Sequence, residues 1–329
     1  MSHPQSILAF VDHRPESRIA LEKALALAQR TGGKVTVMDV LESPRWPWQA
    51  KLHDLSLGKR RLELFDVAER MRHERVSVDV ALRSGRPSVE LVRAVLAQGH
   101  DWVIKAAKGR AEGRGSLFGS TAMHLIRKCP SPVWIVGPQG QPTGPRILAA
   151  IDASWGDDPA AAAFARKTLA TATALASNLG AELHVVHAWQ LYGESLLSNR
   201  VSGQELSDLL RREREVAERQ LIATVDEVGE PVAPERIHLE KGSPEQVIPR
   251  LARELGVDAI VMGTVGRSGL AGLLIGEMAE EILNRVDCGV VCVKPDGFVS
   301  PVKLDVQDDA RLLAAGSPQA SSRAPSTAA

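Results

Sequence analysis

The sequence is poor in cysteine and has no long apolar run, and each absence excludes a class of protein. Three cysteines in 329 residues give no disulfide framework and no CxxC pair for zinc or redox work. No apolar stretch reaches about 18 residues, so we predict no transmembrane helix. Residues Met1–Phe10 lack a basic segment followed by a long apolar run, so we expect no secretory signal. The expected compartment is the cytosol.

An excess of charge of either sign is also missing, because Lys plus Arg and Asp plus Glu both number 40. Electrostatic binding of nucleic acid or of an anionic membrane over a broad surface needs a surplus of positive charge, so we expect neither partner. The sequence contains no GxSxG, HExxH or GxxxxGK[ST] pattern. We therefore predict no catalytic set, no metal site and no enzymatic activity.

An internal repeat fills most of the chain. Residues 82–136 align without a gap with residues 239–293. Identical pairs include Gly85 with Gly242 and Gly119 with Gly276. The segments ILAFVD and ILAAID begin the two copies. We predict a first domain over residues 1–138, a Gly- and Pro-rich linker over 139–145, a second domain over 146–300, and a disordered tail over 301–329.

Each half alternates short apolar runs with helical patterns, which is typical of an α/β fold. Strands that are apolar throughout predict a parallel sheet covered by helices on both faces. Ligands of such sheets bind beyond the carboxyl ends of the strands. The functional residues are therefore expected in the loops that follow the strands.

A glycine-spaced loop follows the fourth predicted strand of each half. In the second half it holds Gly263, Gly266 and Gly276; in the first half Gly109 and Gly119 remain, but Ala106 replaces the first glycine. Such glycines let backbone approach a ligand, and the helix that follows offers free N–H groups to an anion. Two such loops in one register point more strongly to a phosphate site than either alone.

These loops resemble the G-x2-G-x9-G-[ST] signature of the universal stress protein family. The resemblance covers almost the whole chain outside the tail. The stretches RKCPSPVWIV, EKGSPEQVIP, GTVGR and VKPD look most like the tandem E type. The resemblance implies two Rossmann-like domains, each with a five-stranded parallel sheet. Their fifth strands would pair and make an internal pseudo-dimer.

In ATP-binding members of that family, the signature loop holds ribose and phosphates and an Asp after the first strand meets the adenine. Carried over by position, the Asp candidates are Asp12 and Asp152. The implied first-half set is completed by Val40, Gly109, Gly119, Ser120 and Thr121. A turn or helix-cap role for each Asp stays open beside the adenine contact.

The second-half loop departs from the signature at its last position, where Glu277 replaces Ser or Thr. An ionised carboxylate cannot donate to a phosphate oxygen and repels it. Glu277 can instead satisfy the helix amides itself, which would make a ligand unnecessary. We therefore treat Asp152, Gly263, Gly266, Gly276 and Glu277 as a vestigial or alternative site, which would take something uncharged.

The first-half loop has the more favourable charges for an anion. Lys105, Lys108, Arg110 and Arg114 lie in or beside it. We expect ATP or another phosphate ligand, if one binds, to prefer this half, although the Ala106 methyl group opposes close approach. Trp46 and Trp48 either line an apolar pocket or, as we favour, cover the sheet.

Three functions stay open at this point. The first is a non-catalytic stress-response module that senses ATP or another phosphate ligand and shifts a surface for an unknown protein partner. The second is a nucleotide-independent scaffold, or a protein for an apolar ligand, with degenerate loops. The third and weakest is a slow ATPase. Association of two chains into a homodimer is compatible with each of them.

Overall fold

The computed structural model describes residues 4–108, 117–137, 144–154, 156, 158–198, 200–265 and 275–304. Ten strands are found there: β1 (Ser6–Phe10), β2 (Lys34–Leu41), β3 (Ser77–Ser84), β4 (Trp102–Ala106), β5 (Val133–Val136), β6 (Arg146–Ala150), β7 (Glu182–Trp189), β8 (Ile237–Lys241), β9 (Ala259–Gly263) and β10 (Gly289–Val293).

Helices alternate with these strands. They are α1 (Ser17–Thr31), α2 (Ala50–His73), α3 (Pro87–Gln98), α4 (Ser120–Lys128), α5 (Pro159–Leu179), α6 (Glu194–Leu197), α7 (Gly203–Val228), α8 (Pro244–Leu255) and α9 (Glu277–Arg285), with short 3-10 turns at Pro47–Gln49 and Pro234–Arg236.

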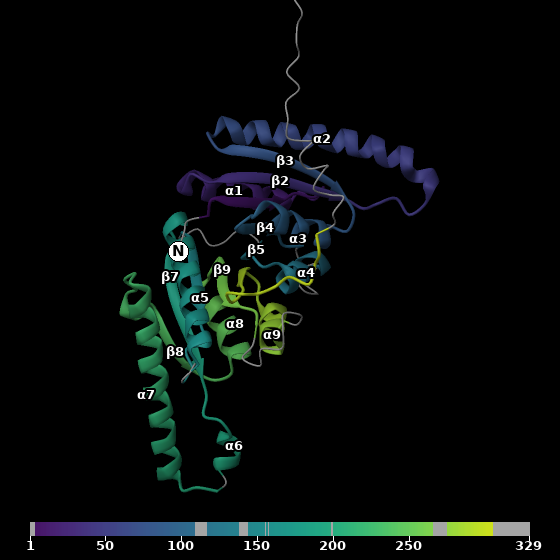
Figure 1. Cartoon of the computed structure of the whole chain (residues 1–329). Helices are drawn as coiled ribbons and strands as arrows, with labels where there is room; N and C mark the ends of the chain where they lie inside the picture. The colour runs from purple at the N-terminus through teal and green to yellow at the C-terminus, as the bar shows by residue number, and fades with distance from the viewer. Residues whose placement is uncertain are drawn as a thin grey trace, which may run out of the picture.

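All ten strands form one sheet, in the order β3-β2-β1-β4-β5-β10-β9-β6-β7-β8. Within each half the five strands are parallel. The single antiparallel contact joins β5 to β10 and pairs Trp134 with Val291. The predicted α/β fold is therefore confirmed, with five parallel strands in each half, and the halves join within the chain through their fifth strands into one sheet (Figure 1).

Helices cover both faces of the sheet, which explains why the strands are apolar throughout. Residues of α1, α2, α5 and α7 share one buried cluster with one side of the strands. Residues of α3, α4, α8 and α9 share the other cluster. In each half the first helix ends at a glycine in the left-handed region, Gly32 at φ 69° and Gly180 at φ 61°, where a side chain would be strained.

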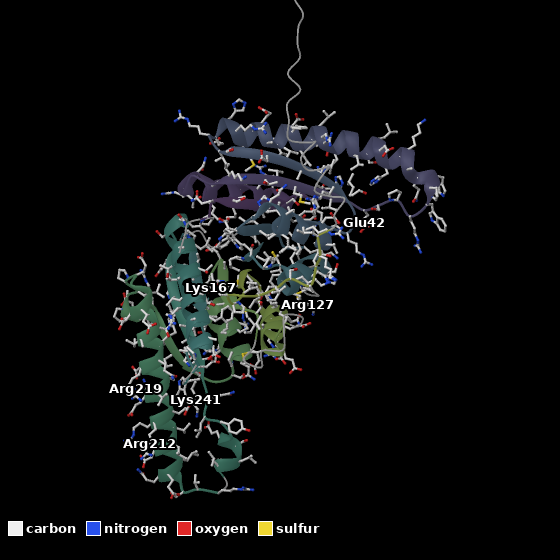
Figure 2. The ribbon with its side chains drawn as sticks, in the orientation of Figure 1. Glu42, Arg127, Lys167, Arg212, Arg219 and Lys241 are labelled. Atoms are coloured by element: carbon white, nitrogen blue, oxygen red, sulfur yellow. The ribbon has the colours of Figure 1, made fainter. Side chains whose placement is uncertain are left out.

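The junction between the halves is close and partly polar. A side chain on Gly137, just after β5, would collide with the backbone of Gly289 in β10. Across the same junction, Arg127 of α4 donates to both carboxylate oxygens of Glu280 of α9 at 3.0 Å. Figure 2 shows Arg127 between these helices. Helices α4 and α9, which occupy matching places in the two halves, thus contact each other as well as the sheet.

After the last strand of the second half, the chain returns to the first half and contacts it. Val302 packs against the apolar cluster, and the carbonyl of Lys303 accepts a bond from Arg93 Nε of α3 at 3.3 Å. The first residues of the predicted tail therefore have defined contacts, and the tail from residue 305 onward lies outside the described residues. In the described part of the chain, none of the helices combines the length and apolarity that a membrane crossing requires.

Candidate binding edges at the strand ends

The candidate residues gather at the carboxyl ends of the parallel strands, as such sheets predict. In the first half these are the ends of β1, β2 and β4, with the start of α4 nearby. In the second half they are the ends of β6, β7 and β9, with the start of α9 nearby. The two edges carry different side chains and are described separately.

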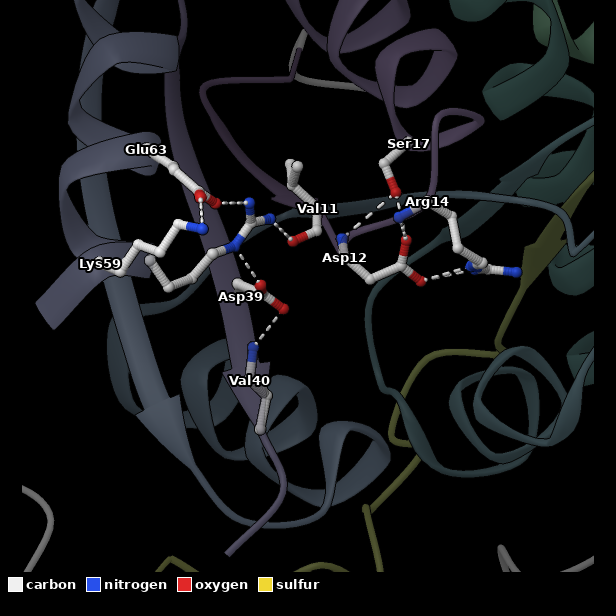
Figure 3. Close-up of polar contacts among 9 residues, drawn as sticks. Val11, Asp12, Arg14, Ser17, Asp39, Val40, Lys59 and Glu63 are labelled. Atoms are coloured by element: carbon white, nitrogen blue, oxygen red, sulfur yellow. Dashed lines mark hydrogen bonds and ion pairs between the residues drawn. The ribbon is translucent and has the colours of Figure 1, made fainter. Parts of the chain in front are cut away.

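Asp12 follows β1 and is fully engaged within its own turn (Figure 3). One carboxylate oxygen accepts from the Ser17 hydroxyl and, at 3.1 Å, from the Arg14 backbone N–H. The other accepts from Arg14 Nε at 2.8 Å and Nη2 at 2.6 Å. Burial alone would raise the pKa of Asp12, but the hydrogen bonds from Arg14 and Ser17 outweigh it and lower the pKa. This geometry favours the turn-and-cap role, and an adenine would have to displace Arg14.

A buried ion pair lies beside Asp12 at the end of β2. Arg60, from α2, donates through Nε to Asp39 Oδ2 at 2.6 Å and through Nη2 to the Val11 carbonyl at 3.0 Å. The backbone N–H of Val40 donates to the other oxygen of Asp39 at 2.7 Å. Val40 itself is buried among apolar residues. The backbone N–H of Val40, which the sequence placed in the nucleotide site, is thus already bonded to Asp39 (Figure 3).

Lys105, near the end of β4, is buried and does not belong to a solvated edge. Its ammonium group donates to the Ala106 carbonyl at 2.9 Å and lies 5.6 Å from the centre of the Phe10 ring. Burial, together with the charge of Arg14, lowers the pKa of Lys105 to about 8. Of the four cations expected near the first loop, Lys105 thus points into the protein, Lys108 is exposed, and Arg110 and Arg114 lie outside the described residues.

The start of α4 presents its amide groups without a side-chain cap. Gly119 is the N-cap residue, Ser120 is exposed and Thr121 half-buried, and the first turn has no acidic residue. A Cβ on Gly119 would meet only the Lys108 side chain, at 3.5 Å, which is ordinary van der Waals contact. The Lys108 N–H donates to the Leu117 carbonyl at 3.1 Å and brings the two segments together. The packing of the described residues does not itself require glycine at position 119.

The second-half edge keeps Asp and Gly at the matching positions 152 and 276, but the described contacts around them differ. Asp152 is exposed and accepts the backbone N–H of Ser154 at 3.0 Å. Where the first half has Asp39, the second has His187, whose Nδ1 lies 3.3 Å from the Ile151 carbonyl and whose Nε2 lies 3.2 Å from the Ser154 hydroxyl. A buried lysine is present here too: Lys294, which follows β10, donates to Thr264 at 2.8 Å. Burial lowers its pKa to about 8.

Gly263, the first signature glycine of this half, packs against an aromatic ring. A Cβ on Gly263 would lie 2.6 Å from Cε1 of Phe164, a residue of α5. Helix-to-strand packing favours glycine here, irrespective of any ligand, because the Phe164 ring would have to shift to admit a Cβ. The pattern of the sequence cannot separate this requirement from a ligand requirement, since both select glycine.

Glu277 is the first residue of α9 and is exposed. Among the described residues it makes no hydrogen bond to the amides of the helix, and Gly276, the N-cap residue, provides no side-chain cap. The expected self-capping by Glu277 is not seen. A free carboxylate at this helix start opposes a phosphate more directly than a self-capped one would. Gly109 and Gly266, the middle glycines of the signatures, lie outside the described residues.

The expectation that Trp46 and Trp48 cover the sheet is wrong. Trp46 is 54% exposed and Trp48 is 75% exposed, on the turn that precedes α2. The turn stands clear of the sheet because α2 begins there and only its later residues, from Arg60 onward, are buried. Sequence reasoning also missed Asp39 with Arg60, and Phe164 with Gly263, because both pairs join segments far apart in the chain.

Comparison with known proteins identifies related chains. A family model described as Universal stress protein family matches residues 4–137 and 145–294. Universal stress protein E of Salmonella typhi is 29% identical over 94% of this chain and 100% of its own length. Universal stress protein E of Escherichia coli K12 is 28% identical over 94% of this chain and 100% of its own length.

Solved structures share the fold. A protein of unknown function from Pseudomonas aeruginosa PAO1 aligns with a TM-score of 0.69 at 24% identity and covers 90% of this chain and 95% of that one. A universal stress protein from Archaeoglobus fulgidus aligns with a TM-score of 0.60 at 20% identity and covers 88% of this chain and 98% of that one. Both are similar over both halves of the sheet.

Proposed function

The chain belongs to the universal stress protein family, and we propose that it acts as a stress-response binding module, without catalysis, whose first half takes up a phosphate-bearing ligand such as ATP. The proposal depends on one observation above all, the start of α4. Gly119 there is free of packing demands from the described residues, the first turn has no acidic residue, and Ser120 offers an exposed hydroxyl. An anion that approaches the helix amides accounts for glycine at this position.

The second half is the poorer site on the same grounds. The free carboxylate of Glu277 stands at the start of α9, and Gly263 is explained by the Phe164 ring. A unit charge at 4 Å from a phosphate oxygen costs about 1 kcal/mol in water and about 4 at an effective dielectric of 20. We propose that the phosphate ligand binds one half of the pseudo-dimer and that the protein works in the cytosol.

The test is isothermal titration with ATP and, separately, with inorganic phosphate. Ser120→Ala removes a donor to a charged acceptor, so the affinity should fall about tenfold or more. Gly119→Val places a branched side chain where the anion would lie and should abolish binding. Gly276→Val in the second half is the matched control and should bind like the unaltered chain. Unchanged binding in both first-half variants would remove this site.

A second candidate function, a scaffold that needs no nucleotide, has one observation in its favour. Both carboxylate oxygens of Asp12 are already occupied by Arg14 and Ser17, so a base finds no vacant partner there. Phosphate binding without adenine absorbance in the purified protein would favour a phosphate site without base recognition. If the protein binds neither phosphate nor ATP, the scaffold is favoured. If mass spectrometry of the purified protein detects a lipid, an apolar ligand is favoured.

A further inference from the structure

Helix α2 carries apolar side chains on two opposite sides. Leu64, Ala68 and Met71 face the sheet and are buried. The other side holds what we call the outer stripe: Leu52, Leu55, Leu62 and Phe65, with exposed fractions of 64%, 65%, 68% and 44%. Figure 1 shows α2 beyond β3, at the first-half end of the molecule. An apolar row of this length on a solvent-facing helix marks an interaction surface.

The corresponding helix of the second half lacks such a row. The outer side of α7 is dominated by the charges of RREREVAER, and its exposed large apolar residues are Val216 and Ile222, at 40% and 41%. Figure 2 shows Arg212 and Arg219 on α7. The outer stripe is therefore a feature of the first half and is not demanded by the shared fold.

The spacing of the outer stripe is self-complementary. At about 100° per residue, its four members lie on one side of the helix, and they are placed symmetrically about the point between Gly58 and Lys59. A two-fold axis through that point brings Leu52 opposite Phe65 of a second copy and Leu55 opposite Leu62 of the second copy. Such isologous pairing is what a closed dimer requires.

Charges on the same side of α2 fit the same axis. Lys51 and Asp66 are both exposed and have no ion pair within the described part of the chain. The two-fold axis that pairs the leucines brings Lys51 of one copy opposite Asp66 of the other, twice in the dimer. Opposite charges at the border of an apolar patch favour one register over its alternatives.

Gly58 lies at the centre of the stripe, in the middle of a 24-residue helix. Glycine is a poor helix former, and a Cβ there would meet nothing within 4 Å in the single chain. Packing inside the chain therefore gives no reason for glycine. A second helix crossing at this point gives one, because the two-fold axis sets Gly58 opposite Lys59 of the second copy, and glycine leaves room for that long side chain.

We propose that the outer stripe of α2 is an interface between two copies of this chain, packed antiparallel about an axis near Gly58. The four stripe residues alone bury less than the standard interface of about 800 Å² per partner. The dimer is therefore reversible and its population depends on protein concentration. It leaves the β5–β10 junction and the start of α4 untouched.

Sedimentation equilibrium of the full chain, from about 1 to about 100 µM, tests the proposal. The mass should rise with concentration from the 35.4 kDa of one chain to twice that value. Leu55→Asp with Leu62→Asp should weaken association by about tenfold or more. Val216→Asp on α7 is the matched control and should leave association unchanged. A chain that stays monomeric throughout, or a dimer that survives the double substitution, would overturn the proposal.

Charge reversal tests the register with exposed residues alone and little risk to folding. Lys51→Asp should weaken the dimer because it faces Asp66 of the second copy, and Lys51→Asp with Asp66→Lys should restore it. If the double variant stays as weak as the single one, the antiparallel register is wrong. Association of the unaltered chain with phosphatidylcholine vesicles in place of dimer formation would identify the stripe as a lipid contact and also overturn the proposal.

Discussion

The two halves place different groups beside the same backbone carbonyl at the end of their second strands. The first half uses Arg60, held by Asp39, to donate to the Val11 carbonyl. The second half places His187 beside the matching carbonyl of Ile151. One solution buries an ion pair that joins β2 to α2, and the other uses a single ring on β7. Duplication of the fold thus preserves the position of this carbonyl while the side chain beside it changes.

The same contrast extends to the edges where ligands of this fold bind. Each half buries one lysine with a pKa lowered to about 8, but Lys105 sits on β4 and Lys294 follows β10. The helix that starts at each edge begins with Ser120 in one half and Glu277 in the other. Edges that differ this much in charge are not expected to take the same ligand.

Removal of Asp39 is expected to have the largest effect on stability. Asp39→Ala leaves the buried guanidinium of Arg60 without its main partner, and the free energy of unfolding should fall by about 3–5 kcal/mol. His187→Ala, the matched change in the second half, loses only weaker contacts and should cost about 1–2 kcal/mol. Urea denaturation followed by circular dichroism measures both. Equal losses would show that Arg60 finds full compensation in Glu63 and would break the comparison.

His100 should make the stability of the first half depend on pH. The matching residue of the second half, Val257, does not titrate and cannot have this effect. Burial lowers the pKa of His100 from 6.5 to about 4, assisted by Lys34. The unfolded chain therefore takes up a proton first as the pH falls, and stability is lost from about pH 6.5 downward. The loss at about pH 5, relative to neutral pH, should be about 2 kcal/mol.

The matched variant for that measurement is His100→Val, the residue of the second half. Because other histidines also titrate, the difference between the unaltered chain and His100→Val isolates this one group. The variant should lose less stability between neutral pH and about pH 5, by roughly the same 2 kcal/mol. Parallel stability–pH curves for the two proteins would show that His100 titrates normally.

Periodicity and the internal repeat can be read along the sequence without knowing any side-chain contact, and they suffice to predict the five parallel strands of each half, their helices and the position of the candidate edges. The side-chain partners are not local. Arg60 reaches Asp39 across 21 positions and Phe164 reaches Gly263 across 99, so no spacing rule finds them. The exposure of Trp46 and Trp48 could not be predicted from the sequence either. Large aromatic side chains are typical of residues that cover a sheet, yet these two lie exposed on a turn outside it.

Gly263→Ala should have a small effect, similar to that of His187→Ala, and it separates a glycine needed for packing from a glycine needed for a ligand. The added methyl group would lie 2.6 Å from the Phe164 ring, so the ring must shift, at a cost of about 1–2 kcal/mol. Phe164→Leu should recover most of that loss, because the shorter side chain leaves room for the methyl group. In the first half, the position that matches Phe164, counted back from Gly32 as Phe164 is from Gly180, is Glu16, the N-cap residue of α1, so no aromatic ring stands at the position that matches Phe164. If Gly263→Ala lowers the affinity for phosphate while the denaturation midpoint of the protein stays unchanged, the glycine serves a ligand. The second half would then be the phosphate site.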